Sequence, residues 1–171
     1  RHGVALLAAI RRVTDKPVRL ALITHTRQEF LFGAAAYREQ AIPIHMHAKA
    51  AALMRARCER CLKTLNQLLG EDAMRGTVMF KPEQEFDHSL SIDVIGRPLQ
   101  VIHFGHSSGP GDVVLLDLQS GVLFAGGLLD ELRIPDVQDA DLDGWTQALQ
   151  ALRRLPVMVV VPGHGPAASV K

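Results

Sequence analysis

The chain has 171 residues, of which 47% are hydrophobic and 22% charged, and its formal net charge is +1. This composition is typical of globular proteins, and a chain of this length can bury one hydrophobic core. A charge near zero argues against a nucleic acid or an anionic membrane as the main partner. No apolar run reaches the ~20 residues that a membrane-spanning helix needs.

The N-terminal part alternates helices with short strands. Apolar spacing predicts helices at residues 4–14 and 31–40 and strands at 18–23 and 41–45. Since the two strands flank a helix, they are expected to form a βαβ unit with parallel pairing and a right-handed crossover.

The longest predicted helix covers residues 48–69, with one apolar stripe that includes both cysteines, Cys58 and Cys61. Their C-x-x-C spacing suits a thiol redox pair or half of a zinc site. Cysteines on an apolar stripe also act as small core residues. We favour the core interpretation, because the chain has no second cysteine pair to complete a metal site.

The second half of the chain has the pattern of an antiparallel meander. Short strands are predicted at residues 78–80, 90–95, 99–104, 113–118 and 122–125. A final helix, capped by Asp139 or Asp141, should run to about Arg154. The last strand, residues 157–161, is a β-branched run that predicts burial on both faces.

Three loops that follow predicted strands carry a histidine beside a small residue or proline. They are Thr24-His25, Phe104-Gly105-His106 and Gly163-His164-Gly165. Side chains that bind ligands in α/β proteins are commonly placed at strand ends, and imidazole is a common ligand and acid–base group. The three histidines are therefore expected to converge on one cleft.

At this point the sequence resembles the metallo-β-lactamase-fold hydrolase superfamily, and most closely its branch of quinoprotein relay system zinc metallohydrolases. The resemblance is carried by the His25 and His164 loops together with Arg57-Cys58-Glu59-Arg60-Cys61, Met74-Arg75-Gly76-Thr77, residues 121–126, Arg133-Ile134-Pro135 and Gly144-Trp145. It implies an α/β fold, a four-layer αββα sandwich, with one or two zinc ions at the sheet edge. It also implies a hydrolase linked to a quinoprotein dehydrogenase system in the periplasm.

The family's strand-end motif, Thr-His-x-His-x-Asp-His, is only partly retained. His25 takes the first position, but Arg27, Glu29 and Phe30 stand where the family has His, Asp and His. Arginine cannot coordinate a cation. The family's bridging aspartate corresponds to Gly127, which has no ligand atom in a side chain.

The family's middle histidine falls on Ser108 when it is counted back from Asp112, and on His106 when it is counted forward from Gly105. The candidate metal ligands are therefore His25, His164, His106 and Glu29, as the resemblance implies. They are enough for one zinc ion at most, with Asp130 as a compensating ligand.

Two functions remain open at this stage. The first is a zinc-hydrolase-like protein with a degenerate metal site. The second is a non-catalytic protein that binds a ligand or partner in the vestigial cleft, where Arg27 would recognise an anion. A redox module based on Cys58 and Cys61 finds little support.

The resemblance covers residues 1–171 as one domain, but the family normally begins with strands that precede the position of Val4. We therefore expect the domain to be N-terminally incomplete, either as a fragment or because those strands were lost. The strand at residues 18–23 would then have an exposed edge or face.

Overall fold

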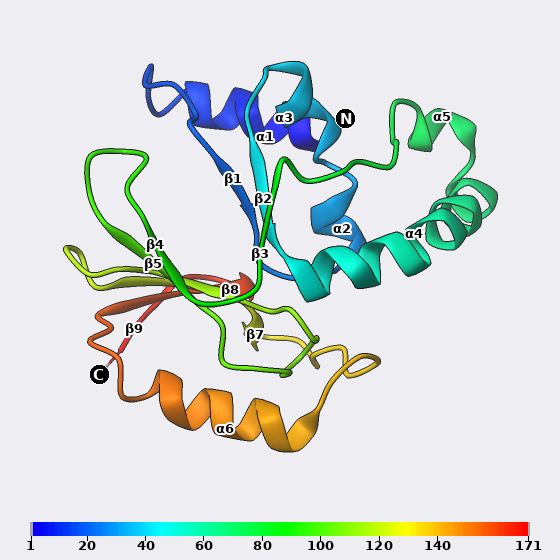
Figure 1. Cartoon of the computed structure of the whole chain (residues 1–171). Coiled ribbons are helices and arrows are strands. Elements are labelled where there is room, and N and C mark those ends of the chain that lie inside the picture. Colours follow the sequence, from blue (N-terminus) through cyan, green and yellow to red (C-terminus); the bar gives the residue numbers. More distant parts are fainter. Residues whose placement is uncertain (1, 171) are drawn as a thin grey trace.

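Two β-sheets lie face to face between layers of helices (Figure 1), which is the predicted αββα arrangement. The structure is a computed structural model that describes residues 2–170, apart from the side chains of Glu29 and Phe30. Within this part of the chain, none of the helices combines the length and the apolar character needed to cross a membrane.

The first sheet has three parallel strands in the order β1 (Ala21–Ile23), β2 (Ile44–His47) and β3 (Gln84–Phe86). The predicted parallel βαβ unit is therefore confirmed, and β1 lies at an edge of this sheet in the described part of the chain. The prediction of a strand at residues 78–80 was wrong. Phe80 is buried in the core without strand pairing, since apolar spacing reports burial and not hydrogen bonding.

Five helices precede β3 in the described chain: α1 (His2–Arg11), α2 (Gln28–Leu31), α3 (Ala35–Glu39), α4 (Ala48–Leu69) and α5 (Glu71–Met74). The helix predicted at residues 31–40 is split in two around Gly33. A Cβ atom on Gly3 of α1 would lie 2.1 Å from the Gly33 carbonyl oxygen. The backbones of α1 and the α2–α3 junction thus touch, and only glycine fits at this contact.

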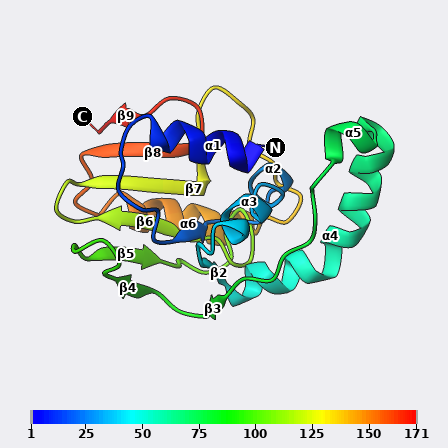
Figure 2. The same ribbon diagram turned by 90° about the horizontal axis from the view of Figure 1, so that it is seen from above.

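Helix α4 has the predicted bounds, and its N-terminus is capped by His47, whose Nδ1 accepts a hydrogen bond of 3.2 Å from the Lys49 backbone N–H. Its first half is buried on one face through Met54 and Cys58. Its second half extends beyond the sheets (Figure 2), and Leu68 there is 74% exposed.

The second sheet has six strands in the order β4 (Leu90–Ile92), β5 (Leu99–Ile102), β6 (Val114–Asp117), β7 (Val122–Asp130), β8 (Val159–His164) and β9 (Ala168–Ser169). Strands β4 to β7 form the predicted antiparallel meander. Strand β8 is parallel to β7. All residues of β8 are only half-buried, so the predicted burial on both faces was wrong; its outer neighbour, β9, is just two residues long.

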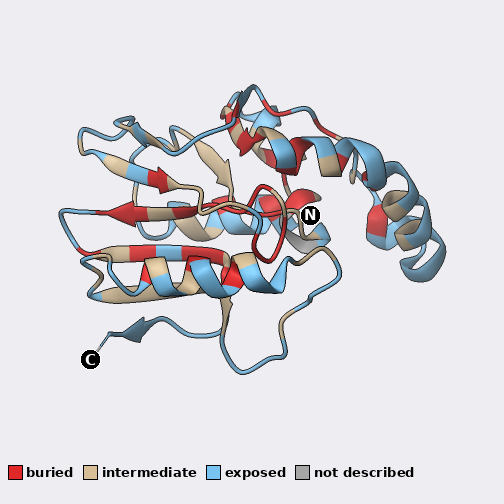
Figure 3. Cartoon of the chain, turned by 60° about the horizontal axis from the view of Figure 1, so that its bottom comes forward, coloured by how far each residue is buried: buried red, intermediate tan, exposed pale blue. Residues whose placement is uncertain are grey.

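Helix α6 (Leu142–Leu152) covers the outer face of the second sheet (Figure 3). Asp141, and not Asp139, caps it, because the Asp141 carboxylate accepts a hydrogen bond from the Gly144 N–H. Trp145 on its buried face donates a hydrogen bond of 3.0 Å from Nε1 to the Leu128 carbonyl. The buried residues between this helix and the sheet are Val114, Leu116, Leu123, Ala125, Leu128, Ala148 and Leu152.

Replacement of Leu116 by alanine should lower the free energy of unfolding by about 2–5 kcal/mol, because it leaves a cavity in this core. Leu116 is 0% exposed. The matched control is Leu68→Ala on the exposed half of α4, which should change stability by less than about 0.5 kcal/mol. Urea unfolding of both variants measures the difference, and equal losses would contradict the placement of these two leucines.

Candidate functional site

A cleft of about 310 Å³ opens where the carboxyl ends of β1, β7 and β8 meet the start of α2 and the side of α4. Its polar lining contains two histidines, three arginines and three aspartates: His25, His164, Arg27, Arg57, Arg133, Asp130, Asp136 and Asp139. The wall formed by α2 and α4 is mostly apolar, with Leu31, Leu53 and Met54. Of the predicted site residues, His25, His164 and Arg27 therefore share one cleft.

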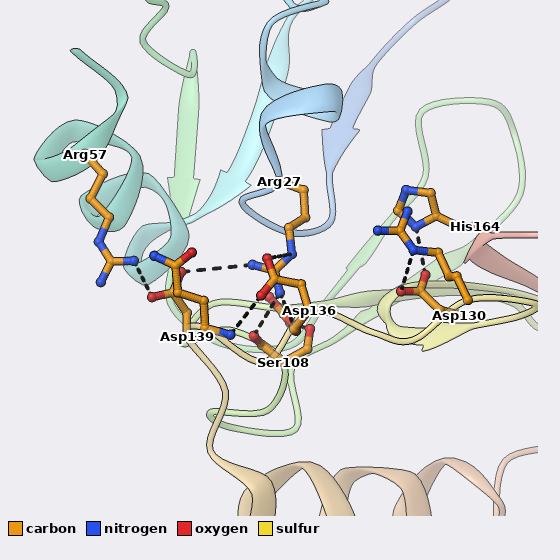
Figure 4. Close-up of polar contacts among 10 residues, drawn as sticks. Arg27, Arg57, Ser108, Asp130, Asp136, Asp139 and His164 are labelled. Carbon is orange, nitrogen blue, oxygen red and sulfur yellow. Dashed lines mark hydrogen bonds and ion pairs between the residues drawn. The ribbon is translucent and has the colours of Figure 1, made fainter. Parts of the chain in front are cut away.

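His164 and Asp130 are the last residues of two neighbouring strands. They are paired in the parallel register of β7 with β8. The His164 Nδ1–H donates a hydrogen bond of 2.8 Å to Oδ1 of Asp130, and this contact is drawn in Figure 4. Both side chains project from the ends of adjacent strands, so the backbone pairing of β7 with β8 holds His164 and Asp130 next to each other. Arg133 Nε lies 3.9 Å from the other oxygen of Asp130.

His25 follows β1 and is 3% exposed. Its Nδ1 shares a hydrogen bond of 2.8 Å with the Thr24 hydroxyl. The two sheets come very close here, because Gly126 of β7 has φ +52° and a Cβ atom on it would lie 2.8 Å from Thr24. Burial, followed by the positive charge of Arg27, lowers the pKa of His25 to about 4, so its imidazole is neutral at pH 7.

Arg27, just before α2, points its guanidinium into the cleft and is 16% exposed. Its Nη2–H donates a hydrogen bond of 2.9 Å to the Asp136 carbonyl, and a longer one of 3.5 Å to the Ser108 carbonyl. Its Nε lies 3.7 Å from the Asp136 carboxylate. The Arg27 side chain is thus held by the loop between β7 and α6 (Figure 4).

Asp139 from the same loop lies between two arginines. One of its carboxylate oxygens is 4.0 Å from Nη1 of Arg27, and the other pairs with Nη1 of Arg57 on α4. The Asp139 backbone is held in turn by His106, whose Nε2–H donates a hydrogen bond of 2.6 Å to the Asp139 carbonyl. His106 does not line the cleft, so it does not converge with His25 and His164.

Ser108, the other candidate for the middle histidine position, is the one that adjoins Gly127 and His25. A Cβ atom on Gly127 would lie 2.6 Å from Ser108 Oγ and 3.0 Å from Cδ2 of His25. Ser108 is buried, and its hydroxyl donates a hydrogen bond to Asp112. Burial raises the pKa of the Asp112 carboxyl, and the Ser108 hydrogen bond and Arg27 oppose that shift.

The described residues can be compared with the metal site that the resemblance implies. No three His, Cys, Asp or Glu side chains among them are arranged to hold a metal ion. Any side chain at Gly127 would require Ser108 to move. Glu29, a predicted ligand, has its side chain outside the described residues. Its role as a ligand remains a prediction, as do those of His25, His106 and His164.

The two cysteines have different surroundings, and both are free thiols. Cys58 is 4% exposed and packs in the core of the first sheet, as predicted. Burial raises its pKa, which keeps the thiol protonated. Both cysteines line the cleft, but Cys61, one helical turn further along, is only half-buried and is not part of the core cluster that holds Cys58, so its predicted place in the core was wrong.

Sequence reasoning gave no site role to Arg57, Asp136 or Asp139. Asp139 was considered only as a helix cap, and Arg57 only as part of a family motif. The loop residues 131–141 carry no periodicity that could have revealed these contacts. One local signal was available for Arg57. It lies beside Cys58 on α4, so its side chain was expected next to the buried face of that helix.

Comparisons with known proteins agree with this architecture. A family model described as "Metallo-beta-lactamase superfamily" matches residues 2–164. A metallo-beta-lactamase type 2 from Bacteroides fragilis is 32% identical over 89 residues, which cover 49% of this chain and 36% of that protein. The match therefore spans only about a third of this curated relative's length.

Many solved structures are similar to this chain, and two of them show the extent of the match. A metallo-beta-lactamase from Pontibacter korlensis is 26% identical, with a TM-score of 0.77, and the match covers 96% of this chain and 70% of that one. The metallo-beta-lactamase FIM-1 from Pseudomonas aeruginosa, in its mono-zinc form, is 23% identical, with a TM-score of 0.67 and coverage of 96% and 66%. At that identity the second similarity shows the fold alone.

The low pKa of His25 should make stability depend on pH. Because the pKa falls from the usual 6.5 to about 4 on folding, the unfolded chain binds the proton more readily. The resulting stability is fully present above pH 6.5 and is lost as the pH falls toward 4. Between pH 7 and pH 5 the loss should be about 2 kcal/mol.

Urea unfolding at both pH values, for the parent and for His25→Gln, measures this contribution. The variant lacks the titrating imidazole but keeps all other ionisable groups, so it should lose about 2 kcal/mol less than the parent over the same interval. Equal losses in the two proteins would contradict a buried, neutral His25.

Proposed function

The chain belongs to the metallo-beta-lactamase superfamily, and from that premise we propose that it is a zinc-hydrolase-like member with a degenerate metal site. The observation that carries the proposal is the position of Arg27. This arginine stands where the family motif has a ligating histidine, and its guanidinium lies in the cleft beside His25.

A fixed cation in this cleft opposes the binding of a second one. The guanidinium of Arg27 stays charged at any physiological pH. Its positive charge, after burial, lowers the pKa of His25, a candidate ligand in the same cleft. In a partly buried site such repulsion is poorly screened. Asp136 and Asp139 both form ion pairs with Arg27. Their carboxylates therefore already have a cationic partner other than a metal ion.

The nitrogens of His25 and His164 remain in the cleft as candidate ligands for at most one weakly bound zinc ion, with Asp130 or Glu29 as the carboxylate. A bound zinc ion would supply Lewis acidity and an acidified water. A protein of this fold has been solved in a mono-zinc form. Asp130, however, already accepts a hydrogen bond from His164 and lies near Arg133.

The branch assignment is part of the same proposal. The motifs Arg133-Ile134-Pro135 and Gly144-Trp145 support the quinoprotein relay system branch. That branch brings with it a link to a quinoprotein dehydrogenase and a periplasmic location. These two features rest on the motifs alone.

A second candidate function is a non-catalytic protein that binds an anionic small molecule in the cleft. The contacts of Arg27 favour it. Its guanidinium already makes hydrogen bonds and ion pairs to oxygen atoms inside a cleft of about 310 Å³, which is large enough for a small ligand. Arginine binds carboxylates and phosphates with a planar set of donors.

Zinc content is the direct test of the degenerate site. Native mass spectrometry of the purified protein after equilibration with zinc should find less than one ion per chain. The variant Arg27→His replaces the cation with a ligand, leaves the tight contact of Gly127 with Ser108 and His25 unchanged, and should bind one ion. Bound zinc should also raise its stability, by about 2.7 kcal/mol at a hundredfold excess over the dissociation constant.

Arg55→His serves as the matched control, because Arg55 lies on α4 outside the cleft and pairs with Glu85. It should leave zinc content unchanged. Stoichiometric zinc in the parent protein, lost on His25→Ala or His164→Ala, would contradict the degenerate site and favour an intact zinc hydrolase.

A further inference from the structure

The most unusual feature of the cleft is a carboxylate shared by two arginines. Arg27 and Arg57 are 30 positions apart and come from different elements, yet both approach Asp139, one at each carboxylate oxygen. Figure 4 shows the row that they form, with Arg57 on α4 at one end and Arg27 at the other. Two guanidinium groups repel each other unless an anion lies between them.

We propose that Arg27 and Arg57 form a binding site for a small oxyanion, such as a carboxylate, and that the Asp139 side chain fills this site as an internal competitor. The proposal deepens the second candidate function and rests on it. It adds Arg57 as a ligand-binding residue, and it gives Asp139 the role of a built-in ligand that must be displaced.

The loop brings the Asp139 carboxylate to the arginines because its backbone is anchored at two points, at Asp139 and at Asp141. The Asp139 carbonyl accepts the hydrogen bond from His106 Nε2, and the Asp141 N–H donates one of 2.9 Å to the Ser107 carbonyl. The side chain of Asp139 is only 13% exposed, although the loop around it is largely exposed. An anchored carboxylate of this kind acts at a high effective concentration.

An external ligand can still reach the arginine pair. The Arg57 side chain is 45% exposed, so one of the two guanidinium groups meets solvent at the cleft mouth. The contact between Arg27 and Asp139 is long, at 4.0 Å, and can be replaced by a closer charge-assisted hydrogen bond. Beside the arginines, Leu53 and Met54 of α4 offer an apolar wall for the rest of the ligand.

The test is a calorimetric titration at low ionic strength, where charge interactions are least screened. Succinate and inorganic phosphate are the two probes, one planar at each charged end and one tetrahedral. Asp139→Asn removes the competing charge while keeping the shape, and it should bind one or both probes at least tenfold more tightly than the parent. Adding Arg57→Gln to this variant should abolish the gain.

Arg55→Gln is the matched control, because Arg55 is on the same helix and also pairs with a carboxylate, but lies outside the cleft. In the Asp139→Asn background it should leave affinity unchanged. The gain in affinity for succinate relative to phosphate identifies the preferred oxyanion. Equal affinity in the parent and Asp139→Asn, or equal losses with Arg57→Gln and Arg55→Gln, would overturn the proposal.

Arg57→Lys keeps the charge but loses the planar set of donors, so it should retain only part of the gain. The variant therefore tests the site without a large change in charge, and an unaltered affinity would count against a guanidinium site. The zinc content of the same preparations separates this proposal from the degenerate metal site. Stoichiometric zinc in the parent would contradict the degenerate metal site. The calorimetric titration, independently, tests whether Arg27 and Arg57 bind an oxyanion.

Discussion

The parallel pairing of β7 with β8 is the constraint on which the site depends. It places Asp130 opposite His164 at the carboxyl ends of the two strands, so that their side chains meet without help from the loops. The same end of β7 lies close to the segment after β1, because Gly126 has no side chain and leaves room for the Thr24 side chain. His25 therefore reaches the same cleft. A shift of one residue in this register would separate Asp130 from His164.

Charge balance is the second organising feature of the cleft. Three arginines and three aspartates line it, and each arginine lies within an ion-pair distance of an aspartate. His25 stays neutral because it is buried and lies near Arg27. The cleft thus carries its positive charge on fixed guanidinium groups. A zinc site would instead leave neutral imidazoles and carboxylates available for the metal.

Local patterns in the sequence were sufficient for most of the elements. Helix α4 begins and ends at the predicted residues, and the meander of β4 to β7 follows the predicted order. The errors occurred where long-range contacts decide the outcome. Apolar residues near Phe80 are buried without forming a strand, and contact with Gly3 accompanies a break in the helix at Gly33.

The sequence by itself determined the family, the layered α/β fold and the strand-end positions of His25 and His164, because these depend on periodicity and on motifs close together in the chain. Only the tertiary structure showed that Ser108, and not His106, lies beside Gly127. It alone also brought Arg57 and Asp139 together. The reason is physical. Charge pairs between a helix and an irregular loop leave no periodic signal, and they exist only after packing has fixed both elements.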